Sequence, residues 1–592
     1  MMKKLLLLFV MLTIVAAVHA ADIKYQWHHT IYGKTKAGNT PVSIIKTTDG
    51  NYVAFASFGS NTLTGTNVYF DGEPFKDAEG KAIEGCPYAG NNDNAVNHNL
   101  LLQKYNQQTG EVLWTVYSDK GYLYNNQAIY PTSDGGLIMI SDVRNLANKT
   151  ETTLFRMVGA DNKKTEVSYT PAGNEKTSTV EGVIAKIDKD GKVKWAKLIA
   201  TTTHPTIEGK DYGGYAAYYR GVVVDSKENI YVCGNYMSSM TFIKRDGTEE
   251  THEAKNTAAW DGTIQTSAGD PFIAKLDKDG YLLQFMTEDE SSIKFASFDK
   301  MVIKNDIIYV SGRIVGDGTS TIKFGDITLK PNNCWSIYYA SLNCNNLSIN
   351  YMKSFVTGKF NGKNQGIQNK NLQYCNGSLY ITGLLIGSMA DDEASSPFIA
   401  TTDRWYEAMV VKVDAQNGKR LAAGTDGKGI SGAFAVVETK DPSSIWLYGY
   451  ALSGMSRLNK YTLEGDKLVK GTEQVALNEA SIGMVCDPLV DGTGIITMGR
   501  TRNNSGKVWG TSAEPTEFFN WGLVLCKHTC EDFLPATPTA IDGIIMQKVK
   551  ATDYNVYSLA GMLIKKAKSL KEAISGLPSG LYIIGGKKII VK

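Results

Sequence analysis

The sequence predicts an all-β protein, a seven-bladed β-propeller closed by its N-terminal strand and followed by a small C-terminal β domain. The composition is the first indication. The 592 residues include 58 glycines, 15 prolines and 31 tyrosines, which is typical of many turns and aromatic-rich strands. The second indication is a hairpin motif that recurs along the chain. The third is that its last copy lacks one strand.

The motif is an apolar run, a polar turn with glycine, and a second apolar run closed by an aromatic residue. "KIDKDGKVKW" (186–195) and "KLDKDGYLLQF" (275–285) are the clearest copies. Each predicts two short strands, here named C and D, joined by Asp/Asn/Gly turn chemistry. Degraded copies lie at 104–114, 338–352, 409–423 and 458–471, and a copy with the first strand alone lies at 521–530.

A second predicted hairpin precedes each copy, and its strands are named A and B. Each has an apolar run, a turn, and a second run that mixes aromatics with glycine. These hairpins lie at 41–58, 127–143, 219–236, 298–314, 369–385, 433–452 and 482–500. The chain therefore supplies complete A, B and C strands for seven units.

The missing D strand is predicted at the N-terminus of the mature chain. "IKYQWHHTIYG" (23–33) places Trp27 where Trp114 and Trp195 stand in two complete copies. If this segment completes the last unit, the chain closes into a ring, as radial β-repeats do to protect their edges.

Long insertions are predicted to gather at one end of the blades. In an antiparallel meander, A–B and C–D turns lie at one end, and B–C and D–A loops at the other. The B–C inserts span 59–98, 144–181, 237–270, 315–334, 386–406 and 501–520, and the D–A loop 201–216 adds to them. Such loops on a rigid scaffold favour a binding face. The alternative is that the inserts shield blade edges.

Aromatic residues in these loops are the candidate binding residues, because a ring offers a flat apolar face at little entropic cost. They suit a glycan or a protein partner, although each ring could instead pack against its own insert. The candidates are Tyr88, Tyr215, Trp260, Trp405, Tyr406 and Trp509.

The N-terminus predicts export. Lys3 and Lys4 precede an apolar run that ends in a small-residue cleavage site after Ala20, so residues 1–20 form a signal peptide. The run is too short to span a membrane comfortably, and we expect no membrane span in the mature chain. The propeller occupies 21–530, a linker 531–543, and the C-terminal domain 544–592. Eight cysteines permit disulfides, whose pairing stays open.

Charge argues against nucleic acid as a partner. The net charge is +2, but residues 541–592 carry +6, and after signal removal residues 21–540 carry −6. A body of that sign is a poor binder of phosphate backbones.

Catalytic motifs are not found, and we expect no catalytic residue, no metal and no cofactor. The "DKDG" turns lack the further oxygen ligands of a calcium loop, and no histidine pair has metal spacing. Propeller sites draw single residues from several blades, so an enzyme acting on polysaccharide, a hydrolase or lyase, remains an alternative. A structural surface-layer protein is another.

One unit resembles a known family of repeats. Its residues match those of the bacterial SBBP-type β-propeller repeats at Asp225, Asn229, Tyr231, Val232, Gly234, Asp270, Phe272, Ala274, Lys275, Leu276, Asp277 and Gly280. The match is loose over the rest of 22–530. The resemblance implies a propeller on extracellular proteins and implies no chemistry.

The C-terminus is similar to the sorting domains of the type nine secretion system in Bacteroidota. The matching residues are Val556, Tyr557, Leu559, Gly561, Leu577, Pro578, Gly580, Tyr582, Lys587 and Lys588, although the usual Pro-Asn-Pro opening strand is missing. The resemblance implies the export machinery as a partner and an extracellular or outer-surface location on a Gram-negative bacterium. The alternative is a small accessory β domain. The whole chain is thus expected to be a secreted or cell-surface, non-catalytic propeller that binds a glycan or protein.

Overall fold

The computed structural model divides the chain into two compact units, Met1–Ala540 and Ile541–Lys592, which are described separately. The described residues are 23–33, 40–58, 68–71, 73–74, 76–77, 79–82, 99–120, 122–144, 153–169, 180–200, 206–207, 210–211, 217–237, 239–255, 269–293, 295–358, 366–391, 395–401, 406–426, 432–438, 441–450, 456–477, 482–491, 494–501, 522–530, 556–557, 563–567, 573, 575, 577, 580–584 and 587–591. The predicted signal peptide (1–20) and linker (531–543) lie outside them.

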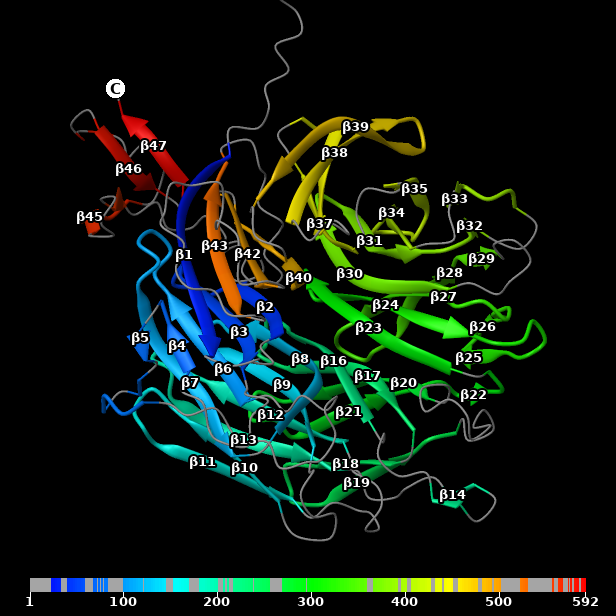
Figure 1. The fold of residues 1–592 in the computed structure, drawn as a ribbon, viewed down its shortest axis with the longest axis horizontal. Helices are drawn as coiled ribbons and strands as arrows, with labels where there is room; N and C mark the ends of the chain where they lie inside the picture. The colour runs from blue at the N-terminus through cyan, green and yellow to red at the C-terminus, as the bar shows by residue number, and fades with distance from the viewer. Residues whose placement is uncertain are drawn as a thin grey trace, which may run out of the picture. The chain divides into compact units, whose positions relative to one another are not determined.

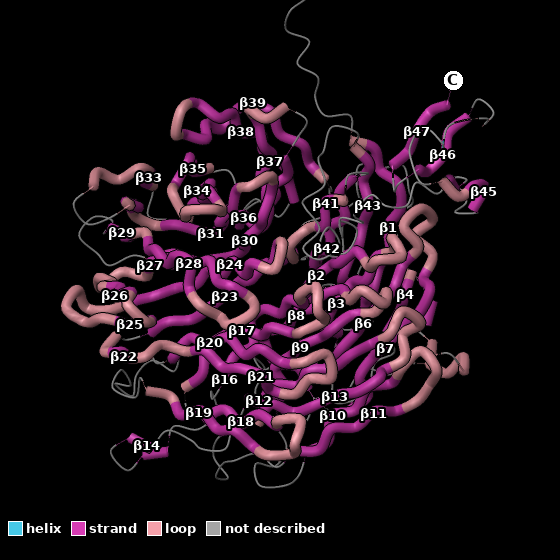
Figure 2. Tube along the Cα trace, turned by 180° about the vertical axis from the view of Figure 1, so that it is seen from behind, coloured by secondary structure: helices cyan, strands magenta, loops and turns pink. Residues whose placement is uncertain are grey.

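All the elements with described bounds are β-strands (Figure 2). In the first unit, groups of four strands recur in chain order, and each strand pairs antiparallel with the next (Figure 1). The first three groups are β2 (Thr40–Lys46), β3 (Tyr52–Phe58), β6 (Asn99–Tyr105), β7 (Val112–Lys120); β8 (Tyr122–Pro131), β9 (Leu137–Arg144), β12 (Val180–Ile187), β13 (Val193–Ile199); and β16 (Ala217–Val224), β17 (Ile230–Tyr236), β20 (Asp270–Leu276), β21 (Leu282–Met286).

The next three groups repeat this order. They are β23 (Phe295–Lys304), β24 (Ile307–Val315), β27 (Ser336–Asn343), β28 (Ile349–Ser354); β30 (Ile367–Cys375), β31 (Ser378–Leu385), β34 (Glu407–Asp414), β35 (Arg420–Thr425); and β36 (Gly432–Glu438), β37 (Ser444–Tyr450), β38 (Ser456–Glu464), β39 (Lys467–Ala476). One parallel bridge between Ala423 and Lys467 joins the last two groups into a single sheet.

The end of the unit combines strands from both ends of the chain. The sheet contains β40 (Ile482–Val485), β41 (Leu489–Val490), β42 (Gly494–Thr501), β43 (Leu523–Thr529) and β1 (Lys24–Gly33). β1 pairs antiparallel with β43, from Lys24 opposite Thr529 to Ile31 opposite Leu523. The N-terminal segment is therefore hydrogen-bonded beside the strand that the sequence left without a partner.

The sheets pack face to face, which explains why their middle strands are buried and largely apolar. Every residue of β3, β17 and β20 is buried, as expected for strands covered on both faces. The first strands contact one another in sequence: β2 with β8, β8 with β16, β16 with β23, β23 with β30, and β30 with β36. β37 then contacts β40, and β40 contacts β2. The first unit is thus an all-β, propeller-like arrangement.

The aromatic residue that closes the motif packs against the turn glycine of the next group. A Cβ atom on Gly110 would lie 2.7 Å from the ring of Trp27, and one on Gly191 would lie 2.9 Å from the ring of Trp114. Both glycines also have positive φ, which a side chain would strain. Trp195 over Gly280 and Tyr351 over Gly418 repeat the contact. The turn glycine of one motif and the closing aromatic residue of another therefore form a contact that joins neighbouring sheets.

The described parts of the B–C inserts extend the outer edge of the preceding group. β10 (Thr153–Val158) and β11 (Lys164–Tyr169) add to β7, and β4 (Val68–Phe70) and β5 (Glu73–Pro74) add to β1. Three other insert hairpins lie just beyond the end of a fourth strand. β18 (Ser239–Ile243) pairs with β19 (Glu249–Glu253), and Thr241 of β18 forms a bridge to Ala200. β25 (Ile322–Phe324) and β26 (Ile327–Leu329) pair with each other and β25 pairs with β22 (Glu290–Ser291), while β32 (Ser388–Ala390) pairs with β33 (Ile399–Ala400) and with β29 (Val356–Gly358). These hairpins cover sheet edges. Shielding of blade edges was the alternative to binding that we gave for the inserts from the sequence.

The remaining elements are small. In the first unit β14 (Thr206–Ile207) pairs with β15 (Lys210–Asp211). The second unit is a four-stranded antiparallel sheet in the order β45 (Leu563–Lys565), β44 (Val556–Tyr557), β46 (Gly580–Ile584), β47 (Lys587–Val591). Among the described residues, no helix has the length and apolar character needed to cross a bilayer. The described cysteines are buried, and Cys233, Cys334, Cys344, Cys486 and Cys526 form no disulfide.

Candidate functional site

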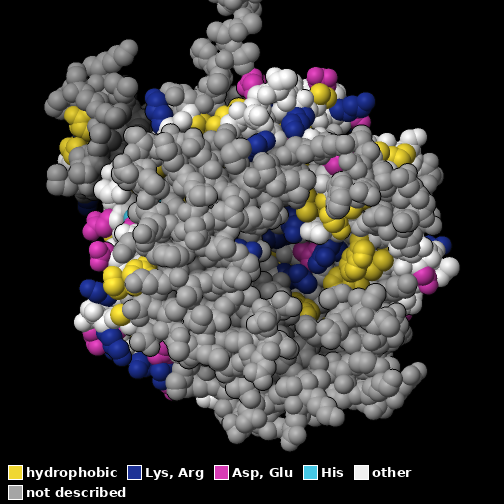
Figure 3. Space-filling model, in the orientation of Figure 1, with side chains coloured by type: hydrophobic (Ala, Val, Ile, Leu, Met, Phe, Trp, Pro, Cys, Tyr) yellow, Lys and Arg dark blue, Asp and Glu magenta, His cyan; other side chains and the backbone are white. Residues whose placement is uncertain are grey.

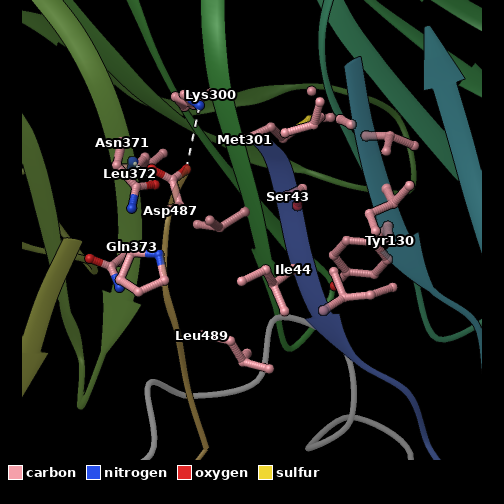
Figure 4. Close-up of a pocket in the computed structure, with 18 of the residues that line it drawn as sticks. Ser43, Ile44, Tyr130, Lys300, Met301, Asn371, Leu372, Gln373, Asp487 and Leu489 are labelled. Atoms are coloured by element: carbon pink, nitrogen blue, oxygen red, sulfur yellow. Dashed lines mark hydrogen bonds and ion pairs between the residues drawn. The ribbon is translucent and has the colours of Figure 1, made fainter. Parts of the chain in front are cut away.

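The candidate site is a cavity of about 210 Å³ between the first strands of the sheets (Figure 4). Because β2, β8, β16, β23 and β30 each contribute, this is the axial cavity of the first unit. Ser43, Tyr130, Met301 and Leu489 are among its apolar and neutral lining, and Arg220, Lys300 and Asp487 are its charged lining.

Irregular pairing of the first strands aims charged side chains at this region. The register shifts between Tyr219 and Gly221 in β16, between Phe298 and Lys300 in β23, and between Asn369 and Asn371 in β30. Each shift leaves one extra residue, as in a β-bulge, which re-aims side chains. The extra residues in these three successive groups are Arg220, Asp299 and Lys370.

Asp299 is the buried centre of an ion network. Its carboxylate accepts a 2.7 Å bond from Arg313 Nε and lies 3.3 Å from Arg220 Nε. Burial would raise the pKa of Asp299, but Arg313 and Arg220 bring it below its usual value. Asp299 is 5% exposed, whereas Arg220 is 21% exposed, so the cation stands on the cavity side of the pair. Ser297 adds a hydroxyl hydrogen bond to Asp299 at 2.8 Å.

A second pair lies beside the first. Lys300 Nζ is 3.5 Å from Asp487, and both side chains are about a third exposed (Figure 4). Burial raises the pKa of Asp487 even though Lys300 lowers it. Lys370 has a lowered pKa, first because of burial and then because of Lys300 and Arg313. Positive groups therefore repel one another at this site, which is the environment an anion would relieve.

Aromatic rings border the charged groups. The guanidinium of Arg313 lies 5.5 Å from the ring centre of Trp335 and 6.0 Å from that of Phe295, within cation–π range. The rings of Trp335 and Phe295 meet edge to face at 5.0 Å. Tyr406, which is 38% exposed, is near enough to contribute to the pKa of Arg313. Figure 3 shows Lys and Arg side chains beside hydrophobic ones in a hollow of the surface.

The amides of the lining have structural roles. Gln373 accepts from the backbone nitrogen of Val436 at 2.6 Å and donates to its oxygen at 3.2 Å, which ties β30 to β36. Asn371 accepts from the backbone nitrogen of Leu372 at 2.8 Å. The charged residues of the lining, Arg220, Lys300 and Asp487, therefore stand among mostly aliphatic side chains.

Of the six residues predicted to bind a partner, Tyr406 is described; it lies near Arg313 and is not among the residues that line the cavity. The other five, Tyr88, Tyr215, Trp260, Trp405 and Trp509, fall outside the described residues. Within the described part, no group of three or more His, Cys, Asp or Glu residues could hold a metal ion.

Sequence reasoning missed the charged bulge residues. Strand periodicity treats each first strand as a regular apolar run, while a bulge depends on how two strands pair. A weak signal exists for two of them: Arg220 and Asp299 each follow an aromatic residue near the start of a largely apolar first strand.

Comparison with known proteins identifies no relative. No family model matches the chain, and no curated protein matches it. Similar solved structures include quinohemoprotein alcohol dehydrogenase from Comamonas testosteroni, with 11% identity over 88% of this chain and 78% of that chain and a TM-score of 0.37. Trypanosoma rangeli sialidase in complex with sialic acid has 9% identity over 93% and 68%, with a TM-score of 0.33. Likenesses of this degree carry no conclusion about function, and the family resemblances drawn from the sequence stay predictions.

Proposed function

We propose that residues 21–530 form an exported, non-catalytic, seven-bladed β-propeller that binds a glycan at the mouth of its axial cavity. One observation carries the proposal: the rings of Trp335 and Tyr406 lie near Arg313, which pairs with Asp299, and Asp487 of the cavity lining faces Lys300. Flat rings stack on the apolar faces of sugars, and partly exposed rings beside a cavity suit that contact.

Seven first strands support the blade count, and β1 supports the closure. The first strands are β2, β8, β16, β23, β30, β36 and β40. β1 would be the fourth strand of the last blade, because it pairs with β43 and because Trp27 packs on Gly110 as Trp114 packs on Gly191. Closure would remove the free edge of the last sheet.

Binding is favoured over catalysis by the state of the carboxylates. Glycoside hydrolysis needs two carboxyl groups that face a common space. Among the described lining residues Asp487 is the one carboxylate, and it faces Lys300 at 3.5 Å. Asp299 lies behind the wall, paired with Arg313 and Arg220. The glycan experiment below would also reveal a hydrolase or lyase, through the products that it releases.

A glycan is favoured over a protein because of size. Pockets for drug-sized ligands usually measure about 300–1,000 Å³. A cavity of about 210 Å³ instead takes one residue or one end of a longer ligand. A chain of sugars can place its terminal residue in the cavity while the rest runs across the rim.

A glycan array probed with the full chain tests the proposal. Tyr406→Ala should weaken binding of the selected glycan at least fivefold. Leu283→Ala, a control at an outer strand where the side chain is 54% exposed, should leave binding unchanged. Release of reducing ends or unsaturated products from that glycan would replace the proposal with the enzyme. Absence of any glycan signal would reject it.

Export and sorting are part of the same proposal. They are supported by the sequences of residues 1–20 and 544–592. N-terminal sequencing of protein recovered from the medium or cell surface should read from Ala21. An intact N-terminus on cytoplasmic protein would contradict export.

A further inference from the structure

A second cavity, of about 440 Å³, lies between the fourth and fifth groups of strands. β27, β28 and β35 contribute to it, together with residues that follow β28 and β32 and the turn before β35. Its volume is in the range of about 300–1,000 Å³ that is usual for pockets that bind small molecules. It shares no lining residue with the axial cavity. The lining residues are Tyr339, Lys353, Ser354, Phe355, Asp391, Gly418, Lys419 and Arg420.

Two rings form the apolar part of this lining. Tyr339 and Phe355 are each 2% exposed, and their ring centres lie 5.0 Å apart. The hydroxyl of Tyr339 donates to the carbonyl of Gly418 at 2.9 Å, so its polar end is engaged by the turn. On its other side, Gly418 packs on Tyr351, whose ring would lie 2.6 Å from an added Cβ atom. The rings and the turn are therefore fixed before any ligand binds.

The ion pair in the lining is already complete. Arg420 Nε lies 3.0 and 3.1 Å from the two carboxylate oxygens of Asp391, and Nη2 donates to one of them at 2.9 Å. The remaining nitrogen, Nη1, donates to Asp466 at 3.3 Å. The guanidinium also lies 4.4 Å from the ring centre of Phe398, which holds it from behind. Arg420 therefore shapes the wall, and a ligand would meet other cations.

Those cations are the two lysines of the lining. Lys353 and Lys419 are exposed, and among the described residues neither ammonium has a hydrogen-bond or ion-pair partner. The lysines that join sheets differ, since Lys104 and Lys275 donate to backbone carbonyls of the neighbouring group at 3.2 and 2.8 Å. An ammonium is a point charge with three donors on a flexible stem. The pair can therefore take the anionic head group of a ligand.

We infer that this cavity binds a small amphipathic carboxylate, with its apolar body against Tyr339 and Phe355 and its head group beside Lys353 and Lys419. Rings and cations belong to one lining, so a single molecule can reach both. Removal of the apolar body from water supplies affinity, and the charges select an anion over a neutral molecule. The inference is independent of the glycan proposal, because the two cavities have no residue in common.

Calorimetry on the full chain with matched small molecules tests the inference. The probes are octanoate and 3-phenylpropanoate, each beside its primary amide, and acetate. At least one of the two acids should bind at least tenfold more tightly than its amide, which keeps the body and lacks the charge. Acetate keeps the charge and lacks the body, so it should bind at least tenfold more weakly than that acid. High salt should remove most of the difference between acid and amide.

Variants locate the bound molecule. Lys353→Gln/Lys419→Gln should weaken binding of the acid at least fivefold and leave its amide within twofold. Both side chains are exposed, so the unfolding midpoint should not change. Ser354→Trp should fill the cavity and weaken binding of acid and amide alike. Lys163→Gln/Lys164→Gln removes the same charge at the turn between β10 and β11, and this control should bind normally.

The outcomes separate this inference from the glycan proposal. Equal binding of acids and amides, unchanged binding in the double lysine variant, or binding of neither acid would overturn the amphipathic carboxylate. Acetate that binds as tightly as the acids would overturn the role of the rings, and with it the inference. Glycan binding would stand in each case, because Lys353 and Lys419 do not line the axial cavity. A glycan array without signal would in turn leave the carboxylate cavity untouched.

Discussion

Two regions of the first unit use the same strands for different purposes. Between the sheets, an aromatic residue covers a turn glycine and a lysine reaches a neighbouring carbonyl, and these contacts recur from group to group. At the axial wall, the bulge residue changes from Arg220 to Asp299 to Lys370 in successive groups. Recurrence indicates a role in joining sheets, whereas variation at equivalent positions indicates a specific site.

The energetic character of the two regions differs as well. The inter-sheet contacts bury rings, and Trp114 also donates its indole N–H to the carbonyl of Lys189 at 2.9 Å, so their loss should cost stability. The wall keeps partly exposed charges in a cavity, so their loss should change binding more than folding. The predictions below test this division, beginning with the largest effect.

Trp114→Ala should lower the free energy of unfolding by about 3–5 kcal/mol, because it removes a buried ring from the contact with Gly191. Urea denaturation of the full chain measures this. Leu113→Ala, at the adjacent 44% exposed residue, should stay within about 0.5 kcal/mol of the parent. Equal effects of the two changes would remove the special role of the ring.

Acid should weaken the joint between β1 and β43. Burial lowers the pKa of His528 to about 4, and the unfolded chain takes up this proton near pH 6.5. The unfolded state therefore binds more protons between these values, and stability present above pH 6.5 falls as the pH drops toward 4. The contribution is up to about 3 kcal/mol.

Unfolding midpoints at pH 7.5, 6 and 5 measure this loss. His528→Gln should remove the part of the pH dependence of the free energy of unfolding that comes from this histidine. Parallel curves for the parent and the variant would show that this histidine does not titrate as expected.

Two lysines compare the regions directly. Lys104→Met should cost about 1–3 kcal/mol of stability, because it removes a hydrogen bond to the carbonyl of Lys189 and takes away the cation that pairs with Asp49. Lys300→Met should change stability by less than about 0.5 kcal/mol, since its pair is a third exposed. Similar costs for both would break the division between joining and binding lysines.

Much of the strand pattern could be predicted from the sequence. The hairpin predicted at 186–195 is the pairing of β12 with β13, and that at 275–285 is the pairing of β20 with β21. Local turn chemistry and alternating apolar residues specify such hairpins within one segment. The insert hairpins and their positions on preceding edges were not predicted, because they pair with strands distant in sequence.

The candidate site could be predicted only in part. Tyr406 was chosen as a loop aromatic, and it lies near Arg313. Arg220, Asp299 and Lys370 were missed, because which residue bulges depends on the register between two strands. Their meeting also requires strands from three groups to converge.

By itself, the sequence determined the all-β class, the repeated hairpins and the aromatic and glycine of each joint, because strand and turn preferences act over a few neighbouring residues. Tertiary structure alone decided which charges share one cavity and which of them are covered. Arg220, Lys300 and Asp487 meet because separate sheets bring their first strands together, and burial then separates the exposed cations from Asp299 behind them.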